Sequence, residues 1–104
     1  LDLSSCRGLT TVEPLRHLPA LQSLDLSDCQ GLTTLESLRH LTSLQSLSLG
    51  GCASLSDVGP LQGLISLQSL DLSYCRGLTT LDLGDLPALQ SLKLSDCDGL
   101  TTVD

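Results

Sequence analysis

The stretch Leu21-Gln-Ser-Leu-Asp-Leu-Ser-Asp-Cys-Gln-Gly-Leu32 decides the fold, because its pattern returns along the whole chain. The core of the pattern, L-x-L-x-x-C, begins at five places: Leu1, Leu24, Leu47, Leu70 and Leu92. The cysteines that close these cores are 23, 23, 23 and 22 residues apart. A constant period of this length indicates a repeat protein, in which each unit packs mainly on its neighbours.

The 104 residues suffice for one domain of stacked units. We expect a single domain, 1–104, with repeats 1–23, 24–46, 47–69 and 70–91 and a partial repeat 92–104. The fourth repeat is one residue shorter; the missing residue falls after Asp82, so that Pro14 of the first repeat has no counterpart. One unit cannot bury its leucines alone, and stacked units therefore bury them in columns.

Two periodicities alternate within each unit. Leu24 and Leu26 enclose one polar residue, an alternation that is typical of a short strand. From Leu32 to Leu44 a leucine recurs at every third residue, which favours 3₁₀ turns or an irregular arc over the 3.6-residue period of an α-helix. Four prolines stand in the return paths, so a full α-helix is not expected there. They are Pro14, Pro19, Pro60 and Pro87.

The core from Leu21 to Leu32, L-x-x-L-x-L-x-x-C-x-x-L, resembles the leucine-rich repeat, and the resemblance recurs in every unit. The short, proline-bearing unit is similar to bacterial internalin-type and protist surface-protein repeats. Its residue pattern, L-x-S-L-x-L-S-x-C-x-G-L-T, is similar to the repeats of plant intracellular immune receptors. The cysteine repeats of F-box proteins share the Cys but are longer. The resemblance implies a right-handed solenoid of the α/β repeat class, mainly β, shaped as a horseshoe. Its concave face would carry a parallel β-sheet, its convex face 3₁₀ or irregular arcs, and its typical work would be protein binding.

From this we expect five strands in the sheet, with the leucine and cysteine columns buried. The resemblance supplies no common catalytic residues. No Ser-His-Asp set can be argued from the residues, because both histidines lie on one side of the coil in the first two repeats. Paired carboxylates have no apolar pocket that would raise one pKa. We therefore expect a protein that is not an enzyme, takes no cofactor and has no small-molecule substrate.

The formal charge of −7 excludes further classes of protein. An acidic chain without basic clusters cannot neutralise phosphates, so nucleic acid is not an expected partner. The longest uninterrupted apolar run is two residues, and no membrane span is expected.

A column of cysteines closes the five strand cores, where the family usually places Asn. The column contains Cys6, Cys29, Cys52, Cys75 and Cys97. We interpret these thiols as structural: each would be a small donor for carbonyl groups of the turn that leaves the strand. The alternatives are disulfides between adjacent coils, whose Cβ atoms would be slightly too far apart, and a zinc site, whose tetrahedral geometry a straight ladder does not offer. Free thiols favour the cytoplasm, and an extracellular location stays open.

Polar positions beside the strand leucines are the candidate interaction face. The members that we single out are Asp2, Asp25, Asp28, Ser48, Asp71, Tyr74, Lys93 and Asp96. The hypothesis is an acidic surface for a basic partner or a cation, with Tyr74 as its anchor, since interface hot spots favour Trp, Tyr and Arg. The alternative is a solvated face that keeps the sheet soluble.

The arcs of the first two repeats share an Arg-His pair, Arg16-His17 and Arg39-His40, with a Glu three residues before each Arg. We expect exposed Arg–Glu pairs at these places; a two-histidine metal or proton site is the alternative. Stacked Thr-Thr pairs, such as Thr33-Thr34, are interpreted as support for the turn after the strand, with O-linked sugars or ordered water as alternatives.

Capping units, which repeat solenoids normally carry, are not evident in this sequence. Two functions of different class follow. The first is a non-catalytic scaffold for protein–protein interaction, as a segment of a longer repeat protein. The second is a structural protein whose uncapped ends stack on each other, so that the chain associates with itself into a filament or oligomer.

Overall fold

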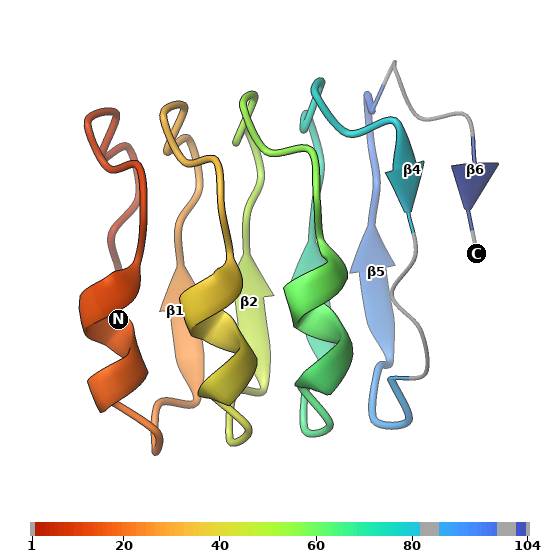
Figure 1. Ribbon diagram of the computed structural model, residues 1–104. Coiled ribbons are helices and arrows are strands. Elements are labelled where there is room, and N and C mark those ends of the chain that lie inside the picture. Colours follow the sequence, from red (N-terminus) through yellow and green to blue (C-terminus); the bar gives the residue numbers. More distant parts are fainter. Residues whose placement is uncertain (1, 82–85, 98–101, 104) are drawn as a thin grey trace.

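Each repeat unit forms one coil of a solenoid, as the computed structural model shows for residues 2–81, 86–97 and 102–103 (Figure 1). A strand runs up one side of the coil, a tight turn follows, and an arc returns on the other side. Four strands form one sheet: β1 (Ser23–Asp25), β2 (Ser46–Ser48), β3 (Ser69–Asp71) and β5 (Ser91–Lys93). The arcs hold the 3₁₀ helices η1 (Glu13–His17), η2 (Glu36–His40) and η3 (Gly59–Gly63).

The sheet is parallel, in the order β1-β2-β3-β5, and equal positions of successive repeats are paired. Leu24, for example, pairs with Leu47, which in turn pairs with Leu70. The prediction of five strands is wrong for the first coil, whose only strand-type pairing among the described residues is an isolated bridge between Asp2 and Asp25. The Leu3 N–H still donates to the Asp25 carbonyl at 2.8 Å, so this coil continues the sheet without forming a strand of its own.

Leucine at every third residue predicts the 3₁₀ arcs correctly. In the second coil η2 ends at His40, and the N–H of the next residue, Leu41, donates to the Leu38 carbonyl. The same contact recurs from Leu44 to Leu41 at 3.0 Å. These i→i−3 bonds bring side chains three residues apart onto one face, which is why the leucines of an arc all point inward.

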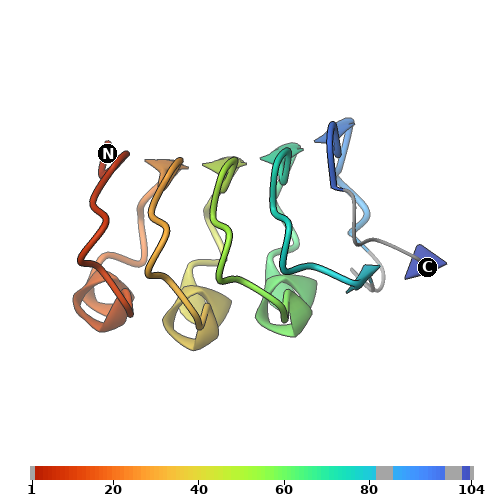
Figure 2. The ribbon, with the colours of Figure 1, turned by 90° about the horizontal axis from the view of Figure 1, so that it is seen from above.

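The coils wind in the right-handed sense in Figure 1, as the twist of parallel strands favours. Figure 2 shows the solenoid from above, with the four strands of this sheet in one layer and the 3₁₀ helices in the other. The strands lie closer together than the helices, because a strand needs less width than a turn of 3₁₀ helix. The strand side is therefore the concave one, as expected.

The interior is a stack of leucines with one column of cysteines. Leu24, Leu47 and Leu70 are no more than 2% exposed, and the column of Leu26, Leu49 and Leu72 is fully covered. Burial is lower in the first and fifth coils, where a described neighbour covers one side only: Leu92, in the same column as Leu47, is 38% exposed. The expectation that whole columns are buried is therefore correct for the second and third coils. It is wrong for several leucines of the other three coils, which are only partly buried: Leu3, Leu9, Leu86, Leu89 and Leu94.

A second, two-stranded sheet pairs β4 (Thr80–Leu81) with β6 (Thr102–Val103). The sequence did not predict it, because these residues occupy the position that leads into the 3₁₀ helix in the other coils. The shortened place after Asp82 lies outside the described residues.

Candidate interaction surface

The concave face presents the polar residues that alternate with the strand leucines. Asp25, Ser48, Asp71 and Lys93 form one row, because the strand register places them side by side. Asp2 joins the row through its bridge to Asp25. The small Ser48 separates the carboxylates of Asp25 and Asp71, so the two like charges are not direct neighbours. Asp71, by contrast, lies beside a lysine.

The aspartates of this row also organise the turn that leaves each strand. The Oδ1 atom of Asp25 accepts the N–H of Ser27 at 2.9 Å, and that of Asp71 accepts the N–H of Ser73 at 2.9 Å. In the first coil Asp2 accepts both the N–H and the hydroxyl of Ser4. These two bonds stabilise the carboxylate, so they lower the pKa of Asp2 below its ordinary value. Among the described residues, these turn hydrogen bonds involve only the Oδ1 oxygen of each aspartate.

A second row follows at the tip of the turn, and every described member of it has a left-handed backbone. The row consists of Ser5, Asp28, Gly51, Tyr74 and Asp96, with φ angles of 62°, 60°, 80°, 63° and 57°. The conformation lets the N–H at this position continue the ladder of the sheet: Asp28 donates to the Gly50 carbonyl at 2.7 Å, and Tyr74 to the Ser95 carbonyl at 2.8 Å. The sequence analysis did not identify this conformation, although Gly and Asp at one repeat position are its usual signal.

A shallow hollow of about 310 Å³ lies between the second and fourth coils at this turn row. It is lined by Asp28, Gln30, Gly51, Ala53, Tyr74 and Arg76. Two of the predicted face residues, Asp28 and Tyr74, thus meet at one hollow. The sequence analysis missed Gln30 and Arg76, which follow the cysteine of their repeats. The signal was present: both stand in one column of the repeat, two positions after the column that contains Tyr74.

The eight predicted residues do not form one compact cluster. Asp28 and Tyr74 share the hollow, whereas Lys93 and Asp96 belong to the fifth coil and Asp2 to the first. All of these five side chains are exposed, and Asp25, Ser48 and Asp71 are half-buried. The structure therefore places the candidate face along the whole described length of the sheet.

The cysteine column behaves as predicted in its hydrogen bonds. The Sγ atom of Cys52 donates to the Leu26 carbonyl at 3.2 Å, and that of Cys75 donates to the Leu49 carbonyl at 3.1 Å. The same bond runs from Cys29 to Leu3 and from Cys97 to Leu72. Each thiol thus satisfies a carbonyl group at the strand end of the preceding coil, which a small apolar side chain could not do.

Burial raises the pKa of the inner thiols. Loss of hydration raises the pKa of Cys52 to about 12 and that of Cys75 to about 11, and it also raises the pKa of Cys29. The prediction of a fully buried column is wrong at its two ends: Cys6 is exposed and Cys97 is half-buried. All five cysteines are free thiols in the structure.

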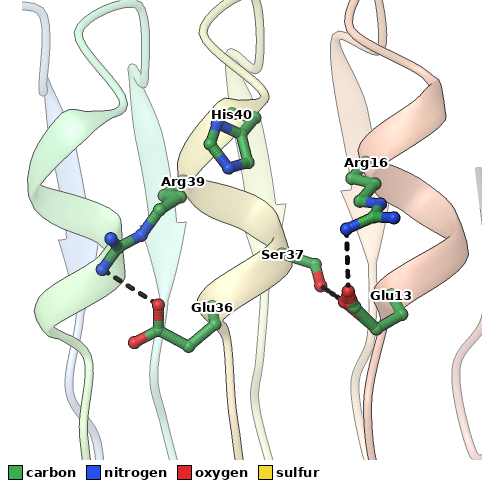
Figure 3. A pocket seen from close by; sticks show the side chains of 6 residues that line it. All are labelled: Glu13, Arg16, Glu36, Ser37, Arg39 and His40. Atoms are coloured by element: carbon green, nitrogen blue, oxygen red, sulfur yellow. Dashed lines mark hydrogen bonds and ion pairs between the residues drawn. The ribbon is translucent and has the colours of Figure 1, made fainter.

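On the convex side a hollow of about 250 Å³ lies between η1 and η2 (Figure 3). Glu13 accepts from Arg16 at 3.4 Å within η1, and Glu36 accepts from Arg39 at 3.0 Å within η2, so the predicted Arg–Glu pairs are confirmed. Glu13 also accepts the hydroxyl of Ser37 at 2.9 Å, and this bond connects the two coils. Figure 3 shows Ser37 reaching from η2 towards the Glu13 carboxylate.

The described residues were predicted to form neither a metal site nor a membrane span. Among them no three His, Cys, Asp or Glu side chains are arranged to hold a metal ion. A search of the same residues finds no helix with the length and hydropathy that crossing a membrane requires.

Comparisons with known proteins agree with this architecture. Residues 20–41 match the family model described as "Leucine Rich Repeat", and residues 42–85 match "Leucine Rich repeats (2 copies)". No curated protein matches the chain significantly.

Among solved structures, internalin C2 (inlC2) of Listeria monocytogenes superposes with a TM-score of 0.63 at 27% identity, over 91% of this chain and 56% of that one. An internalin (inlF) of the same organism superposes with a TM-score of 0.57 at 21% identity, over 92% of this chain and 38% of that one. The chain therefore spans 38% and 56% of the lengths of these two structures. With the repeat, the parallel strand layer and both family matches in agreement, the chain belongs to the leucine-rich-repeat proteins.

Proposed function

We propose that this chain is a non-catalytic scaffold that binds another protein on its concave face. One observation supports the proposal most directly: the strand layer is covered on its inner side by the leucine columns and lies open on the other (Figure 2). Leucine-rich-repeat proteins generally bind protein partners, and the resemblance carries that expectation to this chain. The eight residues named above would then be the contact surface.

The charge of the face indicates the chemistry of the partner. Asp2, Asp25, Asp28, Asp71 and Asp96 place five carboxylates on it, against the single ammonium of Lys93. The whole chain has a formal charge of −7, so the long-range field has the same sign as the face. A partner with a basic surface would be steered towards this side, and its association rate would fall with added salt.

The proposal can be tested by selecting binders from a displayed random peptide library and then locating their site. Ser48→Lys changes the centre of the strand row and removes the hydroxyl that shares a hydrogen bond with Ser27 at 2.6 Å; Lys93 occupies the same row in β5. His40→Arg is the control on the convex face. Circular dichroism and melting first establish that both variants are folded.

Binders that bind Ser48→Lys at least about tenfold more weakly, yet bind His40→Arg unchanged, would support the proposal. Binders that ignore Ser48→Lys and lose affinity for His40→Arg would refute it, because the convex face would then be the binding side. Failure to select any binder above background would also count against a protein-binding face.

End-to-end assembly, the second function expected from the sequence, stays a prediction. Light scattering on this chain at several concentrations tests it: molar mass that grows with concentration supports assembly, and a constant mass of about 10.9 kDa contradicts it.

A further inference from the structure

The hollow at the turn row, which we call the turn notch, exists because the third coil has small residues where its neighbours have large ones. Gly51 and Ala53 form the floor, Asp28 and Gln30 one wall, and Tyr74 and Arg76 the other. The Asp28 carboxylate occupies the space that a Cβ atom on Gly51 would need. The Asp28 side chain therefore extends across the third coil in the direction of the fourth. A side chain at position 51 would prevent this.

The fold does not account for Tyr74. The turn requires a left-handed backbone at this position, and the other four described coils supply Ser, Asp, Gly and Asp. A bulky aromatic residue is an unfavourable occupant of that conformation. Its side chain is 51% exposed, so it regains little by burial. An exposed aromatic residue in such a place is better explained by contact with a partner than by stability.

The walls of the notch are open to solvent. Within the part of the chain that the structure describes, the side chains of Asp28, Tyr74 and Arg76 make no hydrogen bond or ion pair. The Asp28 carboxylate offers two acceptor oxygens, the Gln30 amide offers a third, and the Tyr74 ring offers a π face. Asp25 and Asp71 on the adjoining strands add to the negative field.

We propose that the turn notch receives one arginine side chain of the protein partner. The planar guanidinium would pair with the Asp28 carboxylate through two N–H groups and would stack on the Tyr74 ring, which a lysine ammonium could do only as a point charge. The proposal rests on the proposed protein-binding function and adds to it a specific contact above the strand row. Arg76 opposes the incoming cation, so removing Arg76 and removing Asp28 must change affinity in opposite directions.

The test uses the blocked peptide Ac-Gly-Arg-Gly-NH₂ as the probe, with Ac-Gly-Glu-Gly-NH₂ as its opposite, titrated into ¹⁵N-labelled protein at low salt. We expect chemical-shift changes at Gly51, Ala53 and Tyr74 with the arginine peptide. Asp28→Asn should weaken its binding about threefold, as is typical of one exposed charge pair, and Tyr74→Leu should weaken it by a similar factor. Arg76→Gln should tighten it about twofold.

Asp96→Asn is the matched control. It removes one carboxylate from the same turn row, in the fifth coil and outside the notch. It should weaken binding less than Asp28→Asn does, because Asp96 does not line the notch and would act on the bound cation only through the wider field. If it weakens binding as much as Asp28→Asn does, the attraction is a general charge effect and the proposal is overturned. Tighter binding of the glutamate peptide, with Arg76→Gln weakening it, would overturn the proposal as well.

The two proposals fail separately. Selected binders that depend on Ser48 but bind Asp28→Asn unchanged would keep the scaffold function and reject the arginine site. Binders located on the convex face would reject the scaffold function, whatever the peptide titration shows.

Discussion

Replacing Gly77 by alanine should force two coils of the solenoid apart. A Cβ atom at this position would lie 2.7 Å from the carbonyl oxygen of Ala53 and 3.2 Å from that of Leu55. Both atoms belong to the backbone of the preceding coil, so neither can rotate out of the way as a side chain would. Gly8 holds the same place in the first repeat, and a Cβ atom there would meet nothing within 4 Å. The two glycines therefore form a matched pair.

The expected size of the effect follows from these contacts. Overpacking of this kind costs roughly 1–3 kcal/mol, and the lower entropy of the unfolded alanine chain returns about 0.4–1 kcal/mol. Gly77→Ala should therefore lose roughly 0–2.6 kcal/mol of unfolding free energy, with about 1 kcal/mol at the centre of this range. In Gly8→Ala no clash opposes the effect of the lower entropy of the unfolded chain. This variant should therefore be more stable than the parent chain by about 0.4–1 kcal/mol.

Urea unfolding followed by far-ultraviolet circular dichroism measures both variants against the parent chain. A melting experiment should show the same order, since 1 kcal/mol moves the midpoint of a domain of this size by about 4–8 °C. Equal shifts of the two variants, in either direction, would refute the reasoning. The close approach of the coils would then not be what requires glycine at this position.

Four further predictions concern the core, the thiols and the contact between coils. Leu47→Ala should destabilise the chain by about 2–5 kcal/mol and Leu92→Ala by less than half as much, because Leu47 is 1% exposed and Leu92 is 38% exposed; urea unfolding compares the two. Iodoacetamide should modify Cys52 at least about a hundredfold more slowly than Cys6, as peptide mass spectrometry would show, because burial both covers the Cys52 sulfur and raises its pKa. Below pH 9.0, the ordinary pKa of a thiol, Cys52 is protonated in both the folded and the unfolded chain. Between pH 9.0 and about 12 only the unfolded chain loses this proton, so the free energy of unfolding should fall as the pH rises. A Cys52→Ser variant should lose less free energy of unfolding over that range. Glu13→Ala should cost about 1 kcal/mol in a melting experiment, mainly because the buried hydroxyl of its neighbour in η2 loses its acceptor, while the exposed ion pair adds little.

Most of the architecture could be predicted from short-range patterns. The alternation at Leu24 and Leu26 predicts a strand, and the three-residue period from Leu32 to Leu44 predicts an arc without an α-helix. Both are confirmed by β1 and η2. They could be predicted because each depends on the period of one chain segment, and a regular repeat shows that period several times.

What was missed depends on neighbours in space. The same L-x-L-x-x-C pattern holds for Cys6 and Cys52, yet one thiol is exposed and the other is buried, because burial is set by how many coils cover a position. The pairing of β4 with β6 was missed because it joins two coils at the position that leads into the 3₁₀ helix in the first three coils, and a contact between coils has no local pattern. The turn notch combines residues of three coils, and its shape depends on the direction of the Asp28 carboxylate over Gly51, which no local pattern specifies.

By itself the sequence determined the repeat, the parallel strand layer and the inward-facing leucines, because the spacing of apolar residues dictates which side of each coil must be buried. It also determined the acidic character of the chain, since charge is a property of composition. Only the tertiary structure decided which thiols are buried, which turn residues adopt a left-handed backbone, and that Asp28, Tyr74 and Arg76 border one hollow. These features arise from the stacking of coils, which brings together side chains that are about one repeat or more apart in the chain.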